Sequence, residues 1–178
     1  MKKRVLCLLA DGFEEVETIT PVDILRRADV EVVMASLSGE TVTGRCGVRI
    51  EPDDALAEVI YENFDMLLIP GGPGVAELRS DGRAAMLARE FDELGKSVAA
   101  ICAAPLVLKD AGVLVGRRFT CHFSAVEELP DALPDRLVID GNLITSRGAG
   151  TALDFGMALA ERLAGKAAAG EVAKAIMA

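Results

Sequence analysis

Short apolar runs that stop abruptly are the feature of this sequence that most constrains its fold. Five segments are expected as strands of one sheet: residues 5–10, 30–35, 66–69, 98–101 and 118–121. Continuous apolar runs are typical of strands covered on both faces. The segments with helical spacing are 14–28, 80–94, 103–111, 151–163 and 167–177. This alternation predicts an α/β three-layer sandwich, a mostly parallel sheet with helices on both faces, in a single domain over residues 1–178.

Two further segments are expected as hairpins. Residues 39–50 are polar and punctuated by glycine, which favours a small excursion from the main sheet. Residues 137–145 turn back through Asp140, Gly141 and Asn142. Pro21 lies inside the first expected helix, where it is expected either to kink the helix or to mark a fresh first turn.

The charge balance limits the partners of this chain. It has 19 basic and 28 acidic residues, a net charge of −9, so a phosphate backbone or an anionic membrane surface would repel it. We therefore expect no nucleic-acid binding. No apolar stretch approaches the roughly 20 residues needed to span a bilayer, and the Met-Lys-Lys-Arg start shows no cleavage site. These features predict a soluble cytoplasmic protein without membrane attachment.

Four cysteines lack the spacing of a metal site or a disulfide framework. We expect reduced thiols, and neither a metal nor another cofactor. Cys7 and Cys121 lie in apolar strands and are expected in the core. Cys46 lies in the polar segment 39–50 and is expected to be exposed.

Three loops are expected to meet at one edge of the sheet. The loops at Asp11-Gly12, Pro70–Gly74 and Cys102 each follow a predicted strand. In open parallel sheets, ligands bind outside the carboxyl ends of the strands. This edge is therefore the predicted site.

Cys102 sits where an apolar strand passes abruptly into a helix, among the small residues Ala99, Ala100, Ala103 and Ala104. A nucleophile elbow needs small neighbours, because bulky ones would clash in its strained turn. The thiol would then lie at a helix N-terminus, whose unpaired N–H groups favour a thiolate and can hold an oxyanion. The alternative is that Cys102 is a small buried hydrophobe at the end of a core strand.

Carboxylic acids cluster at the start of the first expected helix. One interpretation of Glu14, Glu15 and Glu17 is that they stay in water and complement the helix dipole, which favours acids at a helix N-terminus. A carboxyl buried beside a thiol would behave differently, because desolvation would raise its pKa and let it donate a proton to a thiolate. One such residue would suffice.

The lone histidine and the glycine-rich loop also have two interpretations each. His122 is either structural or the group that does imidazole chemistry, since it follows a predicted strand on the same edge as Cys102. Pro70–Gly74 lacks the spacing of a nucleotide-binding loop. It is either an ordinary tight turn or a means of bringing a backbone N–H close to the site.

Five stretches together resemble the ThiJ/PfpI superfamily, and within it the branch of the Parkinsonism-associated deglycase. They are "LADGFEEVETITPVDILRRA", "LLIPGGPG", "AAICAAPLVL", "TCH" and "LITSRGAGTALDFG", in order and over most of the chain. The resemblance implies a flavodoxin-like sandwich and a homodimer. It also implies that Cys102 is the reactive cysteine, Glu17 the protonated glutamate that donates to it, and His122 the nearby histidine.

The resemblance further implies that Gly72 and Ala103 supply the amides of an anion pocket and that Arg147 flanks the site. This chain departs from the family at Ala149 and Phe123, where proline is common. These departures concern the detail of the pocket more than the pair of Cys102 and Glu17.

Other features separate the chain from neighbouring families. Ala103 stands where proteases of the superfamily have a histidine, and His122 is not part of the later His-x-Glu pair of class I amidotransferases. The order "GRCG" differs from the Cys-Ser-Arg order of relatives, so neither Arg45 nor Arg49 is assigned as a contact to a partner subunit.

The activity implied by the resemblance is cofactor-independent detoxification of reactive carbonyls. Its substrates would be small dicarbonyls, which a glyoxalase III-like reaction converts to hydroxyacids, or early glycation adducts. The alternative is an oxidative-stress sensor or redox-regulated chaperone without turnover, in which Cys102 forms a sulfinic acid. Hydration of isocyanides or other small electrophiles would use similar groups.

Overall fold

The computed structural model describes residues 2–37 and 39–178. The strands are β1 (Arg4–Leu9), β2 (Glu31–Ser36), β3 (Val42–Thr43), β4 (Arg49–Ile50), β5 (Asp54–Ala55), β6 (Met66–Ile69), β7 (Ser97–Ile101), β8 (Leu137–Asp140) and β9 (Leu143–Ser146). The α-helices are α1 (Glu15–Arg27), α2 (Val75–Asp81), α3 (Arg83–Glu93), α4 (Pro105–Asp110), α5 (Ala152–Ala164) and α6 (Lys166–Ile176).

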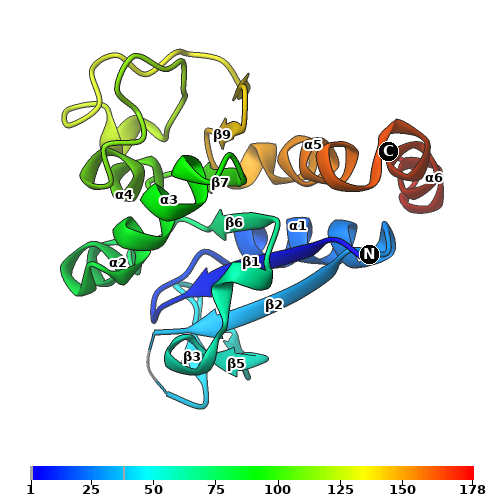
Figure 1. Ribbon diagram of the computed structural model, residues 1–178, viewed down its shortest axis with the longest axis horizontal. Helices are drawn as coiled ribbons and strands as arrows, with labels where there is room; N and C mark the ends of the chain where they lie inside the picture. The colour runs from blue at the N-terminus through cyan, green and yellow to red at the C-terminus, as the bar shows by residue number, and fades with distance from the viewer. Residues whose placement is uncertain (1, 38) are drawn as a thin grey trace.

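The main sheet has the strand order β5-β2-β1-β6-β7-β9-β8 (Figure 1). Neighbouring strands are parallel except for β8, which runs antiparallel to β9. The chain leaves β1 in one direction toward β2 and later returns to the other side of β1 as β6. The order of strands therefore reverses between β1 and β6, and a doubly wound sheet binds ligands at such a point, outside the carboxyl ends of its strands.

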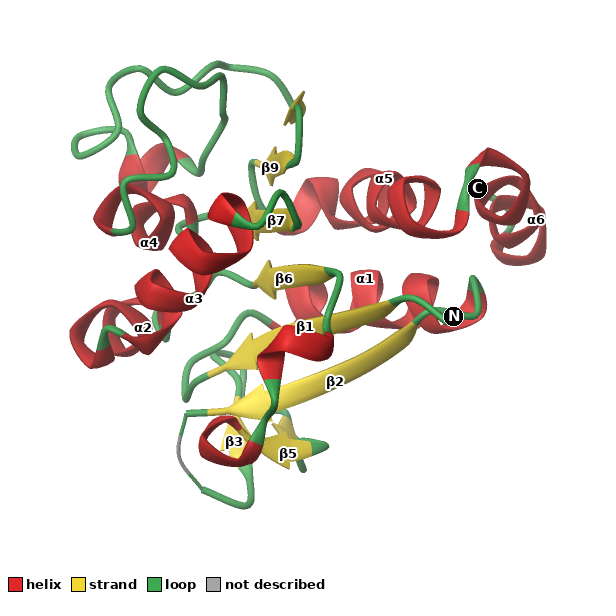
Figure 2. Ribbon diagram, in the orientation of Figure 1, coloured by secondary structure: helices red, strands yellow, loops and turns green. Residues whose placement is uncertain are grey.

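Alternate residues of β1 face two separate cores. Leu6 and Leu8 pack into the layer that contains α2, α3 and α4, whereas Val5, Cys7 and Leu9 pack into the layer that contains α1, α5 and α6. Figure 2 shows these two groups of helices on opposite faces of the sheet. Because both faces are covered, the central strands read as continuous apolar runs. The predicted flavodoxin-like three-layer sandwich is confirmed.

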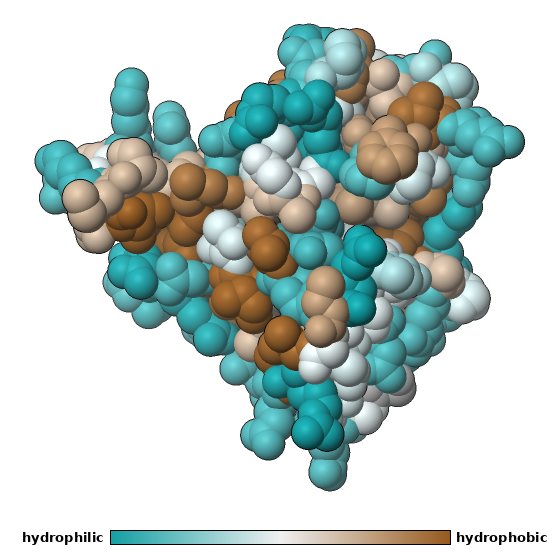
Figure 3. Space-filling model, turned by 180° about the vertical axis from the view of Figure 1, so that it is seen from behind, coloured by the Kyte–Doolittle hydropathy of each residue, from teal (hydrophilic) through white to brown (hydrophobic). Residues whose placement is uncertain are grey.

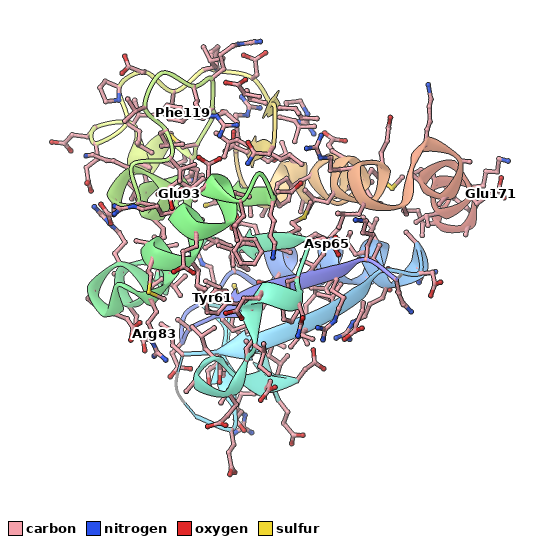
Figure 4. All side chains as sticks on the ribbon, in the orientation of Figure 1. Tyr61, Asp65, Arg83, Glu93, Phe119 and Glu171 are labelled. Atoms are coloured by element: carbon pink, nitrogen blue, oxygen red, sulfur yellow. The ribbon has the colours of Figure 1, made fainter. Side chains whose placement is uncertain are left out.

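The predicted strand 118–121 is wrong. Only Thr120 forms an isolated bridge there, to Leu133, and its N–H donates to the side-chain hydroxyl of Thr145 rather than to a backbone carbonyl of a strand. The apolar pattern of this segment reflects the burial of Phe119, Thr120 and Cys121 in the core rather than strand pairing, and β9 takes the place beside β7. The segment is held by the burial of Phe119, which is labelled in Figure 4.

Other helix boundaries differ from the sequence pattern at identifiable residues. The predicted helix 80–94 is two helices, because Gly82 has a left-handed φ of 83° between α2 and α3. Pro21 lies inside α1, which is continuous from Glu15 to Arg27 and so has no fresh first turn there. The helix expected over 103–111 is shorter, because Pro105 is its first residue.

Both expected hairpins are present. β3 and β4 form a separate two-stranded sheet, and β8 and β9 pair through the turn at Asp140. Cys46 in the first hairpin is exposed, and Cys7 and Cys121 are buried, as predicted. In the described ranges 2–37 and 39–178, the structure has no helix that is both long and apolar enough to cross a bilayer.

Phe155 on α5 is fully buried beneath the sheet, whereas Phe123 is 82% exposed. We expect Phe155→Ala to lower the free energy of unfolding by about 3–5 kcal/mol, because it leaves a cavity in the core. The matched change Phe123→Ala should alter it by no more than about 0.5 kcal/mol. Urea unfolding of the three proteins measures both values, and equal losses would contradict the assigned burial.

Candidate active site

Cys102 directly follows β7 and has a φ of +66°, a left-handed conformation that is strained for any residue other than glycine. Hydrogen bonds on both sides hold this turn. The Cys102 N–H donates to the carbonyl of Ser146 at 2.9 Å, and the Cys102 carbonyl accepts from the His122 N–H at 2.8 Å. The sharp turn expected from the sequence is therefore present, and the side chain is 8% exposed.

The loop after β6 approaches the cysteine so closely that only glycine fits. A Cβ on Gly71 would lie 2.5 Å from both the Cys102 Cβ and Glu17 Oε2. Gly72 has a φ of +95°, and a Cβ there would lie 2.4 Å from the carbonyl oxygen of Gly12. This close approach lets the Gly71 N–H donate to Glu17 Oε2 at 3.1 Å.

Glu17 reaches the cysteine from the first turn of α1. Glu14 caps this helix by accepting the Glu17 N–H at 2.7 Å, and the Glu17 side chain is 1% exposed. The carboxyl forms a hydrogen bond with the Cys102 thiol and accepts from the amides of Gly71 and Ala149. Burial raises the pKa of Glu17 to about 7, and the nearby Glu14 adds to the shift. This carboxyl therefore carries a proton for much of the time near neutral pH.

The pKa of the Cys102 thiol is shifted in the opposite direction from the one expected. Burial, and after it the negative charge of Glu17, raise the pKa to about 12, although the amides of Gly72 and Ala103 act to lower it. The sequence pattern indicated amide dipoles that would lower the pKa of the thiol, but it did not show how strongly burial of the thiol would raise this pKa. The two groups titrate as a pair, in which the charge left after the first proton is lost holds the second proton. A thiolate at neutral pH thus requires that the one proton left on the pair resides on Glu17.

His122 is half-buried and lies beside the pair. Its Nδ1 accepts from the Ser124 N–H at 3.3 Å and lies 2.8 Å from the Ser124 hydroxyl oxygen. A neutral ring held in this way carries its proton on Nε2. The ring Cδ2 lies 3.3 Å from where a Cβ on Gly148 would be. The imidazole is therefore fixed at the same edge as Cys102.

A pocket of about 410 Å³ adjoins this cluster. His122, Phe123, Arg136, Arg147 and Gly148 contribute to its lining. A Cβ on Gly148 would lie 3.5 Å from Glu17 Oε1 and 4.0 Å from the Cys102 Sγ, so Gly148 lies between the pocket and the pair and its lack of a side chain leaves the space there unfilled.

Gly148 was not predicted as a site residue. The signal that could have found it is its place two residues after a buried strand, next to Arg147.

The predicted site residues fall into two groups. Cys102, Glu17, His122, Gly72 and Ala103 come together at the ends of β7 and β6 and the start of α1. Arg147 lies on the rim of the pocket and donates to the carbonyl of Pro134 at 3.1 Å.

Two other features of the molecule bear on the choice of site. A larger hollow of about 910 Å³, between α5, α6 and β8, contains none of the predicted site residues. Over residues 2–37 and 39–178, no group of three His, Cys, Asp or Glu side chains is placed to hold a metal ion.

These features define a class: a doubly wound α/β protein with a cysteine on a strained turn after a strand, hydrogen-bonded to a buried carboxyl. Comparison with known proteins gives the same result. The model of the DJ-1/PfpI family matches residues 3–162. The chain belongs to this family.

Individual relatives are similar over nearly the whole chain. Protein dj-1beta of Drosophila melanogaster is 42% identical and covers 99% of this chain and 98% of its own. Its crystal structure, with the same identity and coverage, has a TM-score of 0.95. The glutathione-independent glyoxalase DJR-1.2 of Caenorhabditis elegans is 36% identical, with 92% and 90% covered. A deglycase of Pyrococcus abyssi is 38% identical, with 81% and 89% covered.

The pairing of Glu17 with Cys102 predicts the effect of Glu17→Gln on thiol reactivity. The neutral amide removes the negative charge of Glu17, which raises the pKa of Cys102, but it also cannot take up the proton of the thiol. We expect the second effect to dominate, so that the pKa of Cys102 rises by about one unit and labelling is about tenfold slower at pH 7. The measurement is iodoacetamide labelling against pH, followed by peptide mass spectrometry. Exposed Cys46 is the internal control. A fall in the pKa would mean that Glu17 is a charged neighbour that only opposes ionisation.

Proposed function

We propose that this protein is a cofactor-independent cysteine enzyme that detoxifies reactive dicarbonyls such as methylglyoxal and glyoxal. The observation that carries the proposal is the hydrogen bond between Cys102, on its left-handed turn, and the buried carboxyl of Glu17. A proton passed from the thiol to Glu17 generates a nucleophile without a net change of charge in the buried site. A core cysteine would need neither the strained turn nor the carboxyl.

In the first step, the Cys102 thiolate adds to the aldehyde carbon and a C–S bond forms. The aldehyde oxygen gains negative charge and is held by the amides of Gly72 and Ala103, which point toward the sulfur. Protonation of this oxygen by Glu17 completes a hemithioacetal. No group outside the site is needed for this step.

In the second step, a proton moves from the former aldehyde carbon to the neighbouring carbonyl carbon. Either Glu17, once deprotonated, or His122 carries it, since both lie beside Cys102. The first carbon is oxidised and the second reduced, so no external oxidant or reductant is required. Water then attacks the resulting thioester, the C–S bond breaks, and a hydroxyacid leaves while Cys102 regains its proton.

The relatives support this class of reaction. One is named a glutathione-independent glyoxalase and two are named deglycases, at identities of 36% to 38%. We include the removal of early glycation adducts in the proposal, because that reaction also requires Cys102 to add to a carbonyl carbon and later to be released from it. The proposed setting is the cytoplasm, where a thiol such as Cys102 stays reduced.

The test is the formation of lactate from methylglyoxal, with the D and L forms measured separately. We expect turnover by the wild type, none by Cys102→Ser, and a loss of about 10²-fold or more in Glu17→Ala, which lacks the proton acceptor. Lactate formation that does not depend on Cys102 would overturn the proposal. If no lactate forms, and mild peroxide adds two oxygens to Cys102 faster than to Cys46, the protein is an oxidation sensor instead.

We also propose that the protein is a homodimer. Val16 and Ile19 on α1 and Leu153 on α5 are 48%, 41% and 43% exposed, and α1 and α5 pack side by side. Apolar side chains gather on the face seen in Figure 3. An exposed apolar face of this kind is typical of a protein interface.

Light scattering tests the dimer directly. We expect a mass of twice 18.7 kDa for the wild type, and a smaller mass for Ile19→Glu, because the charge opposes burial of the face. A wild-type mass of 18.7 kDa would contradict the dimer.

A further inference from the structure

Phe123 is an aromatic side chain in an unusual place. It directly follows His122, is 82% exposed and contributes to the lining of the 410 Å³ pocket. Its ring centroid lies 4.0 Å from that of the His122 imidazole, with the two planes tilted by 37°. A large apolar ring on the surface is unremarkable when it is isolated. Here it forms part of the pocket wall, next to a residue of the candidate active site.

Backbone hydrogen bonds connect the segment that carries this ring to Cys102. Phe123 begins a short 3-10 turn, Phe123–Ala125, in which the Ala125 N–H donates to the His122 carbonyl at 2.9 Å. Ala125 is 2% exposed and anchors the turn in the core. The His122 N–H in turn donates to the Cys102 carbonyl. The backbone that carries the Phe123 ring is therefore connected to the cysteine turn through these hydrogen bonds.

The pocket is larger than the proposed small substrates need. Pockets of roughly 300–1,000 Å³ accommodate drug-sized ligands, and the volume of about 410 Å³ lies within this range. Methylglyoxal carries only a methyl group beside its two carbonyls. The space beyond Gly148 is thus free for a larger substituent, and Phe123, Arg136 and Arg147 contribute to its lining.

We propose that Phe123 is a specificity-determining residue that selects 2-oxoaldehydes with an aromatic substituent. This inference rests on the proposed function and names the substrate class of the same site. The aldehyde carbon would lie at Cys102, and the aromatic group would extend past Gly148 to pack against Phe123. Aromatic rings favour offset or edge-to-face contacts of this kind. The bonds formed and broken are those given above, so phenylglyoxal and water yield mandelate.

The test compares kcat/KM for phenylglyoxal and methylglyoxal in the wild type, Phe123→Ala and Phe123→Leu. We expect the ratio of the two values to fall about two- to tenfold in Phe123→Ala, and to a smaller extent in Phe123→Leu, which keeps apolar area but no ring. Val126→Ala is the matched control, since Val126 is 44% exposed on the same turn but outside the pocket lining. The intact mass after each assay checks that no arginine has been modified.

The outcomes separate this inference from the proposed function. Equal losses for both aldehydes in Phe123→Ala would overturn it, because Phe123 would then act only by supporting His122. If the wild type converts neither aldehyde, the proposed function fails, and mandelate binding by calorimetry decides the inference. In that case Cys102→Ser should bind mandelate more tightly than Cys102→Ser with Phe123→Ala. Equal affinities would overturn the inference.

Discussion

The hydrogen bond between the Glu17 carboxyl and the Cys102 thiol is the interaction on which the candidate site depends. Each group is buried, and burial raises the pKa of both. Alone, either would stay neutral and inert in this environment. Together they can exchange one proton over a short distance, so the sulfur can become a thiolate while the total charge of the pair is unchanged. The raised pKa of Glu17 is thus a requirement of the proposed chemistry.

The contact is possible because the backbone around it is unusually close. Position 71 must be glycine, because any side chain there would collide with the cysteine and the carboxyl. The amides that lower the pKa of the thiol belong to Gly72 and Ala103. Gly148 similarly keeps the opposite side open toward the pocket. The site is therefore built at the ends of separate strands, and the sheet sets the distances between them.

Much of the fold could be predicted from the sequence, and the failures have local causes. The central strands are covered on both faces, so their apolar runs gave their positions within a residue or two. The segment 118–121 has a similar pattern because residues 119–121 are buried, but it forms only one isolated bridge and no strand. Gly82 divides a helix whose apolar spacing continues on both sides of it. Gly148 was missed because a glycine has no side chain whose chemistry could mark it.

The sequence by itself determined the mostly parallel sheet and the edge at which the loops at Asp11-Gly12, Pro70–Gly74 and Cys102 would meet, because both follow from the order and length of apolar segments. The places of Glu17 and His122 beside Cys102 came from the family resemblance. The sequence also indicated the strained turn, through the small residues around Cys102. Only the tertiary structure decided the protonation of the pair and the shape of the pocket. A pKa depends on the water and charges that surround a group, and here these are set by residues distant in the chain.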